Sequence, residues 1–181
     1  MNLDLDRPIA LVGIMGAGKS AVARILGERL GTVVADLDAM IEAEEGRSVA
    51  ELFEREGEAY FRRRESELLA RALGAGARVL ACGGGVVLDP ARRALLRERC
   101  RVAWLDVSPA EAARRVAADQ RTRPLLRGRD PAQELASLLA ARRPLYEEVA
   151  SLRVATDGRT PEQVAAEVLG AARGAAEPGA R

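Results

Sequence analysis

The chain has 181 residues, 48% of them hydrophobic, and its 28 basic and 27 acidic residues leave a net charge of +1. This favours one folded α/β domain and argues against general attraction to nucleic acid or membrane, and no apolar run is long enough to span a bilayer. The absence of histidine excludes histidine catalysis and histidine-ligated zinc, and Cys82 and Cys100 have no metal or redox spacing, so we expect a reduced, cytoplasmic protein.

A phosphate-binding loop signature stands near the start of the chain. The spacing G-x-x-x-x-G-K-S over residues 13–20 follows an apolar run at Pro8–Val12, which predicts a strand, and precedes a helical pattern at Ser20–Leu30. Its glycines would let backbone N–H groups approach phosphate oxygens, and the helix would aim its positive end at the same anion. Lys19 would reach the β- and γ-phosphates, and the Ser20 hydroxyl would ligate Mg²⁺.

The alternative reading of this segment is a glycine-rich strand-to-helix turn that matches the motif by chance. Lys19 argues against it, because it is the only lysine among the 28 basic residues. In a chain that otherwise uses arginine, one lysine at the motif position indicates a need for a compact ammonium on a flexible stem. The sequence therefore predicts a nucleotide-binding protein.

Short apolar runs alternate with helical patterns along the rest of the chain. The runs are typical of strands buried on both faces, and the alternation predicts a parallel sheet with helices on both sides. Further strands are expected at 32–35, 78–82, 102–105 and 152–155, and helices at 58–73, 90–99, 131–149 and 161–172. Prolines that follow good capping residues mark helix starts at Pro90, Pro109, Pro131 and Pro161. We expect one domain over 1–172 and a disordered tail over 173–181.

Three segments interrupt this alternation and are expected to carry function: 36–64, Gly83–Gly85 and 119–130. The first two follow strands directly, and ligands of open parallel sheets bind beyond the carboxyl ends of the strands. Gly83–Gly85 would allow close backbone approach to a ligand, although a flexible turn is the alternative. The third contains the basic stretch Arg121–Arg129, which would close over phosphates as a water-excluding lid, or would be an RNA-binding or solvated loop.

Asp36 and Asp38 end the second predicted strand. Phosphoryl transfer needs one carboxylate near Mg²⁺ and one near the attacking hydroxyl, and these two aspartates could divide the roles. The third strand ends in Ala81–Cys82 and supplies no acid of its own. The alternative is that one aspartate only caps a helix that begins near Ala39.

Arg62, Arg63 and Arg64 follow one another on a predicted helix. Successive residues of a helix point about 100° apart, so at most two of these side chains can face a cleft. From the spacing alone, a functional arginine and a solvated face paired with Glu65 and Glu67 are equally open.

Together these motifs resemble the shikimate kinase family, in the nucleoside-monophosphate-kinase-like group of P-loop folds. The resemblance spans about residues 9–169 and rests on Gly13–Ser20, Asp36-x-Asp38 with Ile41-Glu42, Gly57-Glu58-x-x-Phe61-Arg62, Gly83–Gly85, Arg123-Pro-Leu-Leu126 and Arg142-x-Pro-Leu-Tyr146. It implies a three-layer α/β P-loop fold, with a five-stranded parallel sheet flanked by helices, a lid at about 117–129 and a substrate-binding segment at about 36–64. The implied reaction transfers the γ-phosphoryl group of ATP to the 3-hydroxyl of shikimate, in chorismate and aromatic amino acid biosynthesis.

The resemblance also implies roles for single residues. Lys19, Asp38 and Arg123 would be catalytic, with Asp38 accepting the proton of the attacking hydroxyl and Arg123 closing from the lid. Mg²⁺ would be held by Ser20 and, through water, by Asp36. The implied ATP contacts are Gly13, Met15, Gly16, Ala17, Gly18, Lys19, Ser20, Ala21, Arg115, Arg123, Arg159 and Pro161. The implied shikimate contacts are Asp38, Phe53, Phe61, Gly83, Gly84 and Gly85, with Arg62 and Arg142 clamping the carboxylate and Arg63 and Arg64 left as surface or scaffold residues.

The chain departs from the family pattern at two places, and two other kinds of protein remain as alternatives. Ala21 follows Ser20 where the family often has a second hydroxyl residue, and 117–120 has few glycines for a lid.

One alternative is a kinase of gluconate or another small molecule, and the other is a P-loop switch protein. A GTPase switch would carry Asn-Lys-x-Asp, which is absent here since Lys19 is the only lysine. We expect a monomer that binds neither nucleic acid nor membrane.

Overall fold

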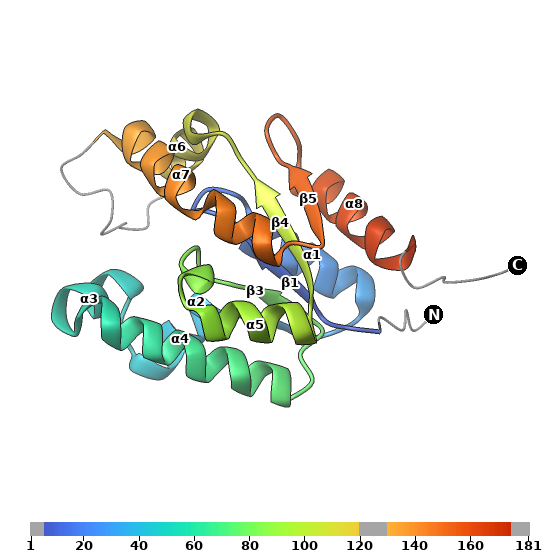
Figure 1. The fold of residues 1–181 in the computed structure, drawn as a ribbon, viewed down its shortest axis with the longest axis horizontal. Coiled ribbons are helices and arrows are strands. Elements are labelled where there is room, and N and C mark those ends of the chain that lie inside the picture. The colour runs from blue at the N-terminus through green and yellow to red at the C-terminus, as the bar shows by residue number, and fades with distance from the viewer. Residues whose placement is uncertain (1–5, 120–129, 175–181) are drawn as a thin grey trace, which may run out of the picture.

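The protein's computed structural model describes residues 6–119 and 130–174 (Figure 1). Five parallel strands form one sheet in the order β2-β3-β1-β4-β5. The strands are β1 (Ile9–Val12), β2 (Val34–Asp36), β3 (Val79–Ala81), β4 (Arg101–Asp106) and β5 (Leu152–Ala155). The predicted five-stranded parallel α/β sheet is therefore confirmed.

Helices cover both faces of this sheet (Figure 1). They are α1 (Lys19–Leu30), α2 (Leu37–Glu45), α3 (Val49–Arg55), α4 (Gly57–Gly74), α5 (Pro90–Arg99), α6 (Pro109–Ala118), α7 (Pro131–Val149) and α8 (Pro161–Gly174), with a short 3₁₀ helix η1 (Val86–Leu88). Helix α1 packs against α8 and β3, whereas α5 and α7 pack against β4 and against each other. Among the described residues, no helix combines the length and the apolarity needed to cross a membrane.

The predicted helix starts are correct because the caps form as expected. Asp89, Ser108 and Asp130 each accept a hydrogen bond from a backbone N–H of the first turn that follows, and a proline occupies the first helical position. Thr160 caps α8 in the same way, since its Oγ1 accepts from the N–H of Gln163 at 3.3 Å. These local bonds satisfy backbone donors that the helices leave unpaired.

The second strand is shifted relative to its prediction at 32–35. The N–H of Thr32 is bonded to the carbonyl of Gly27 in the C-terminal turn of α1, and Val33 is 81% exposed, so neither residue joins the sheet. Strand β2 instead runs from Val34 to Asp36. The shift brings Asp36 to the last position of the strand, at the carboxyl edge of the sheet.

The segment 36–64, which the sequence marks as a break in the alternation, folds as two extra helices, α2 and α3, and the start of α4. The helix expected near Ala39 begins at Leu37. Ser48 and Glu51 form a capping box at the start of α3, which explains why this short helix begins where it does. These helices place a wall opposite the phosphate-binding loop.

Candidate active site

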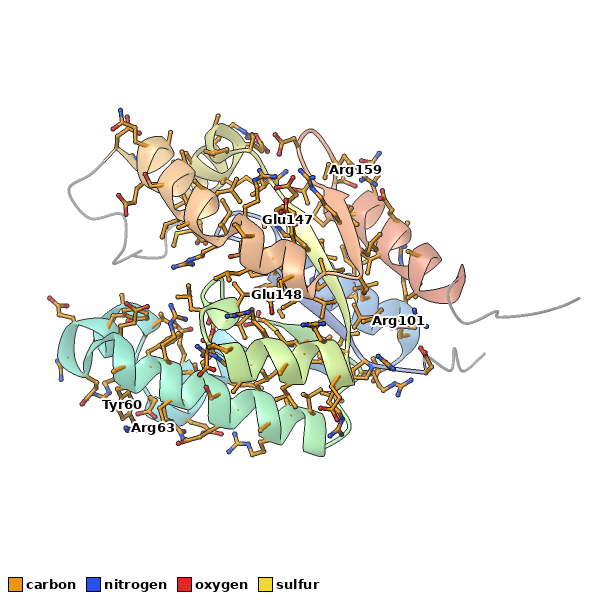
Figure 2. All side chains as sticks on the ribbon, in the orientation of Figure 1. Tyr60, Arg63, Arg101, Glu147, Glu148 and Arg159 are labelled. Carbon is orange, nitrogen blue, oxygen red and sulfur yellow. The ribbon has the colours of Figure 1, made fainter. Side chains whose placement is uncertain are left out.

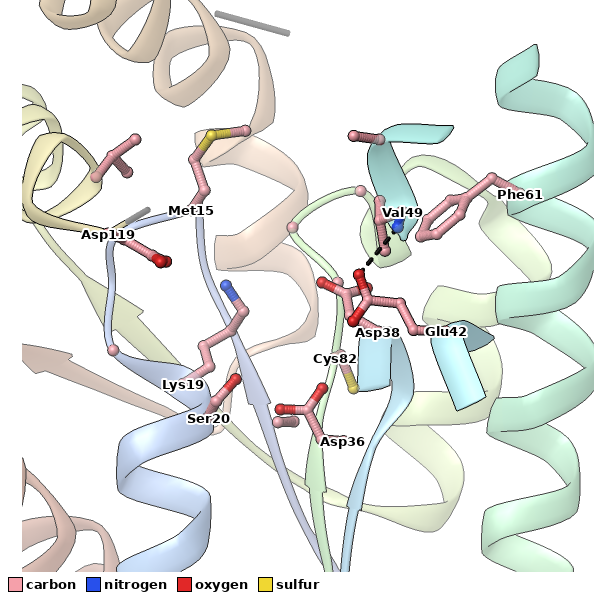
Figure 3. Close-up of a pocket in the computed structure, with 18 of the residues that line it drawn as sticks. Met15, Lys19, Ser20, Asp36, Asp38, Glu42, Val49, Phe61, Cys82 and Asp119 are labelled. Atoms are coloured by element: carbon pink, nitrogen blue, oxygen red, sulfur yellow. Dashed lines mark hydrogen bonds between the residues drawn. The ribbon is translucent and has the colours of Figure 1, made fainter. Parts of the chain in front are cut away.

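A cavity of about 560 Å³ lies at the carboxyl ends of β1, β2 and β3 (Figure 3). Most of the predicted site residues lie on its wall: Met15, Gly16, Gly18, Lys19, Ser20, Ala21, Asp36, Asp38, Phe53, Phe61, Arg62, Gly83, Gly84, Gly85, Arg115 and Arg142. Gly13, Ala17, Arg159 and Pro161 are not among its lining residues. Arg123, the predicted lid arginine, lies outside the described residues.

The phosphate-binding loop needs glycine at Gly16 for two reasons. Its φ of +82° is one that side chains with a Cβ rarely adopt, and a Cβ there would lie 2.7 Å from the carbonyl oxygen of Ala112 on α6. Helix α1 begins after Gly18 with no side-chain cap. Its first N–H groups are therefore directed at the cavity as an anion-binding end.

Lys19, Ser20 and Asp36 lie together at one end of the cavity. The Lys19 ammonium donates to the carbonyls of Gly13 at 2.8 Å and Ile14 at 3.0 Å, which holds the loop closed on itself. Figure 3 shows the side chains of Ser20 and Asp36 pointing toward each other. Asp36 also caps α2 by accepting from the N–H of Ala39 at 3.3 Å, so the residue is at once a helix cap and part of the cavity wall.

Asp38, on the first turn of α2, stands further along the same wall (Figure 3). Glu42, one turn later, accepts a hydrogen bond from the N–H of Val49 at 2.9 Å and so fixes the start of α3 to α2. Cys82 lines the same cavity, and burial raises the pKa of its thiol well above the usual value. Cys82 is therefore a neutral wall of the cavity.

Among the three consecutive arginines, Arg62 faces the cavity. Its guanidinium lies 5.3 Å from the ring centre of Phe61 and 5.8 Å from that of Phe53, and its Nε and Nη2 donate to Glu58 at 3.2 and 3.1 Å. Arg63 points to solvent over Tyr60, at 4.9 Å from the ring centre (Figure 2). Arg62 and Arg63 therefore point to different sides of α4, as expected for successive helical residues about 100° apart.

Arg64 is a scaffold residue on α4. It donates to Glu44 and Glu45 of α2 and to Glu67 of its own helix. These bonds join α2 to α4, which together carry one wall of the cavity.

The three glycines after β3 leave room for charged side chains. A Cβ on Gly85 would collide with the guanidinium of Arg62, and one on Gly83 would collide with the carboxylate of Glu65. A Cβ on Gly84 would lie 3.5 Å from Nη1 of Arg142. Gly85 therefore leaves room for Arg62 and Gly83 leaves room for Glu65, whereas the nearest atom to a Cβ on Gly84 would be the carbonyl oxygen of Gly13 at 3.2 Å.

Arg142 and Tyr146 lie one turn apart on α7 and both reach this glycine segment. The Tyr146 hydroxyl donates to the carbonyl of Gly84 at 2.6 Å, and its ring stacks on Trp104 with ring centres 5.7 Å apart. Burial raises the pKa of Tyr146 to about 12, against the smaller opposing effect of Arg142. The hydroxyl therefore stays protonated and keeps donating.

Of the three residues expected around an adenine, Arg115 lines the cavity, whereas Arg159 and Pro161 do not. Arg115 lines the cavity, but its guanidinium donates to the carbonyl of Gly16 at 3.2 Å and to that of Thr156 at 2.7 Å, tying the phosphate-binding loop to the β5–α8 connection. Arg159 donates to the carbonyls of Ala155 and Gln163 beside the start of α8 (Figure 2). Pro161 is the first residue of α8.

Glu65 excludes one of the two alternatives for the arginine run, the solvated face on which it would pair with an arginine. It is 0% exposed, and its Oε2 accepts from Nη1 of Arg62 at 3.0 Å. A signal for this was present, because Glu65 shares the helical face of α4 with the buried Phe61, Leu68 and Leu69. A single acid on an apolar helical face indicates a buried partner.

Comparisons of the sequence and of the structure with known proteins point to one family. A family model described as shikimate kinase matches residues 15–173. The shikimate kinase of Symbiobacterium thermophilum is 47% identical over 162 residues, covering 89% of this chain and 93% of the relative. The solved shikimate kinase of Acinetobacter baumannii, in complex with shikimate, superposes with a TM-score of 0.88 at 37% identity over 93% of this chain and 94% of that one. A gluconokinase from Sinorhizobium meliloti shares the fold, with a TM-score of 0.60 at 19% identity over 95% of this chain and 94% of that one.

Proposed function

The chain belongs to the shikimate kinase family, and we propose that it transfers the γ-phosphoryl group of ATP to the 3-hydroxyl of shikimate, giving ADP and shikimate 3-phosphate. The observation that carries the proposal is a single cavity with a phosphate-binding loop at one end and Arg62, Arg142 and Asp38 at the other. Planar guanidinium groups suit a carboxylate, and a carboxylate suits hydroxyl donors. A hydroxylated acid is the substrate class that uses both.

In this proposal the acceptor lies over Gly83–Gly85. Arg62 and Arg142 bind its carboxylate, and Phe53 and Phe61 form the apolar side of the pocket. Glu58 holds Nε and Nη2 of Arg62, but its side chain is half exposed, so an incoming carboxylate can replace it. The two arginines and two phenylalanines would hold the shikimate ring so that one hydroxyl faces the phosphate-binding loop.

Asp38 accepts the proton of the attacking hydroxyl as the bond to phosphorus forms. Phosphoryl transfer is catalysed mainly by positioning and by charge stabilisation, so a carboxylate that orients the hydroxyl contributes before it takes the proton. Lys19 and the N–H groups at the start of α1 stabilise the negative charge on the transferring group. Arg123 completes the charge stabilisation by closing from the lid in this proposal.

Mg²⁺ fits the donor set at the end of the cavity next to the phosphate-binding loop. Ser20 and Asp36 offer oxygen ligands, which Mg²⁺ prefers, and two protein groups are typical of a site that takes its remaining ligands from phosphates and water. When bound, the ion would neutralise charge on the β- and γ-phosphates. Ser20 would ligate it directly, and Asp36 would hold it through water.

ATP would occupy the loop with its adenine toward Arg115, and Arg159 and Pro161 would border that end from the start of α8. Arg115 would hold this end chiefly by positioning the loop, given its bonds to Gly16 and Thr156. We further propose that the protein works in the cytoplasm as a monomer, without nucleic acid or membrane partners.

A coupled assay of ADP release tests the proposed function. The protein is supplied with Mg-ATP and, in parallel, with shikimate, gluconate or a nucleoside monophosphate. ADP release that depends on shikimate alone supports the assignment. Release with gluconate instead, or with none of the three despite tight ATP binding, would overturn it and return the alternatives of a gluconate kinase or a nucleotide-dependent switch.

A further inference from the structure

A buried arginine, Arg92, lies behind the proposed carboxylate clamp. It projects from α5, its side chain is only 6% exposed, and it is not among the described residues that line the cavity. Its Nη1 donates to Oε2 of Glu65 at 2.7 Å. The same Oε2 accepts from Nη1 of Arg62 at 3.0 Å, so one carboxylate oxygen of Glu65 is shared by two guanidinium groups.

Arg92 also holds the backbone that carries Arg62. Its Nη1 donates a hydrogen bond to the carbonyl oxygen of Arg62 at 3.3 Å. The contact joins α5 to α4 at the turn from which Arg62 projects. Arg92 therefore touches both the acid that orients the Arg62 side chain and the backbone that supports it.

The charges explain why a second arginine matters here. Glu65 is fully buried, and a buried carboxylate needs a compensating cation. If Arg62 were its only cation, the charge of Arg62 would be neutralised by Glu65, and a substrate carboxylate would have to compete with a buried acid. With Arg92 present, the buried charge of Glu65 is shared between two arginines, and the other acid bonded to Arg62, Glu58, is half exposed, so Arg62 keeps an attraction for an incoming anion.

We propose that Arg92 is a positioning residue for the acidic end of the substrate. It neutralises Glu65 and so leaves Arg62 available to the substrate carboxylate. The inference rests on the proposed function, since it concerns how that carboxylate is bound. Although Arg92 lies outside the cavity, we expect it to affect the binding of shikimate and not that of ATP.

The test compares Arg92→Gln with Arg92→Lys, which are similar in length and differ in charge. Arg92→Gln should raise the KM for shikimate by about tenfold, as expected for loss of one coupled charge contact, with kcat and the KM for ATP within about twofold of the wild type. Arg92→Lys should restore most of the shikimate affinity, because its ammonium still neutralises Glu65. Arg97→Gln is the matched control on the same helix, since Arg97 is 59% exposed and should change neither KM.

A second pair of variants identifies Glu65 as the intermediary. In a Glu65→Gln background there is no buried charge to neutralise, so adding Arg92→Gln should change the shikimate KM by less than about twofold. Thermal unfolding of each variant shows whether it is folded, and if Arg92→Gln alone does not fold, the comparison of Glu65→Gln with the double variant still decides.

Three results would overturn the inference. They are an unchanged shikimate KM in folded Arg92→Gln, equal effects of the Gln and Lys variants, and a full additional effect of Arg92→Gln in the Glu65→Gln background. A wild-type protein that releases no ADP with shikimate would instead overturn the proposed function, and the inference with it. That result is seen before any variant is compared.

Discussion

The backbone of Gly85 lies directly against the guanidinium of Arg62, so that no side chain fits between them. The contact joins the segment after β3 to α4, two parts of the chain that are more than twenty residues apart. Glycine at position 85 therefore makes room for the Arg62 guanidinium, in addition to any role it has against a ligand.

Gly85→Ala should therefore displace Arg62 and weaken binding of the acceptor. We expect a rise of about tenfold or more in the shikimate KM, corresponding to about 1.4 kcal/mol, with the KM for ATP unchanged. Steady-state kinetics with each substrate varied in turn would measure both constants. Gly170→Ala is the control, because a Cβ there meets nothing within 4 Å and the residue lies within α8, where alanine stabilises the helix. A normal shikimate KM in Gly85→Ala would disprove the steric argument.

Arg62→Ala and Arg63→Ala should differ sharply although the residues are neighbours. Arg62→Ala removes a guanidinium from the cavity and should raise the shikimate KM by about 10²-fold, the effect of losing about 2 to 3 kcal/mol of charge-assisted hydrogen bonding. Arg63→Ala removes a side chain that is 63% exposed and should leave both KM values unchanged. Similar kinetics for the two variants would contradict the assignment of the clamp.

Asp38→Asn should lower kcat by about 10² to 10⁴, the usual contribution of a positioned proton acceptor. The amide keeps the shape of the side chain and removes its charge and its basicity. ATP should still bind, since the phosphate-binding loop is unaltered, and calorimetric titration with a non-hydrolysable ATP analogue would check this. Turnover close to that of the wild type would refute the role of Asp38.

Tyr146→Phe should reveal a pH-dependent contribution to stability. The folded-state pKa of Tyr146 is raised by burial from 10.0 to about 12, so the neutral form is favoured in the folded protein. Its contribution is fully present below pH 10 and is lost as the pH rises from 10 toward 12. In urea unfolding at pH 8, the variant should be about 1 kcal/mol less stable, because the bond to Gly84 is missing. The difference between the two proteins should shrink above pH 10, and a difference that does not change up to pH 12 would contradict this account.

Local chemistry determined much of the fold. Each capping residue and the proline after it are neighbours in the chain, so the starts of α5, α6, α7 and α8 could be read directly. The phosphate-binding loop could also be predicted from the sequence, because its glycines, Lys19 and Ser20 lie within eight consecutive residues, 13–20. Strand β2 begins two residues and ends one residue later than predicted, since the exposure of Val33 depends on how α1 ends and not on hydrophobicity.

The sequence by itself thus determined the phosphate-binding loop, the alternation of strands and helices and, through resemblance to a family, a set of residues that the fold brings to one cavity. Only the tertiary structure decided which arginine of the run faces the cavity, that Glu65 is buried, and that Arg92 from another helix shares its charge. The physical reason is distance along the chain. Propensities, caps and loop motifs act over a few residues, whereas the balance of buried charges depends on which helices the sheet brings together.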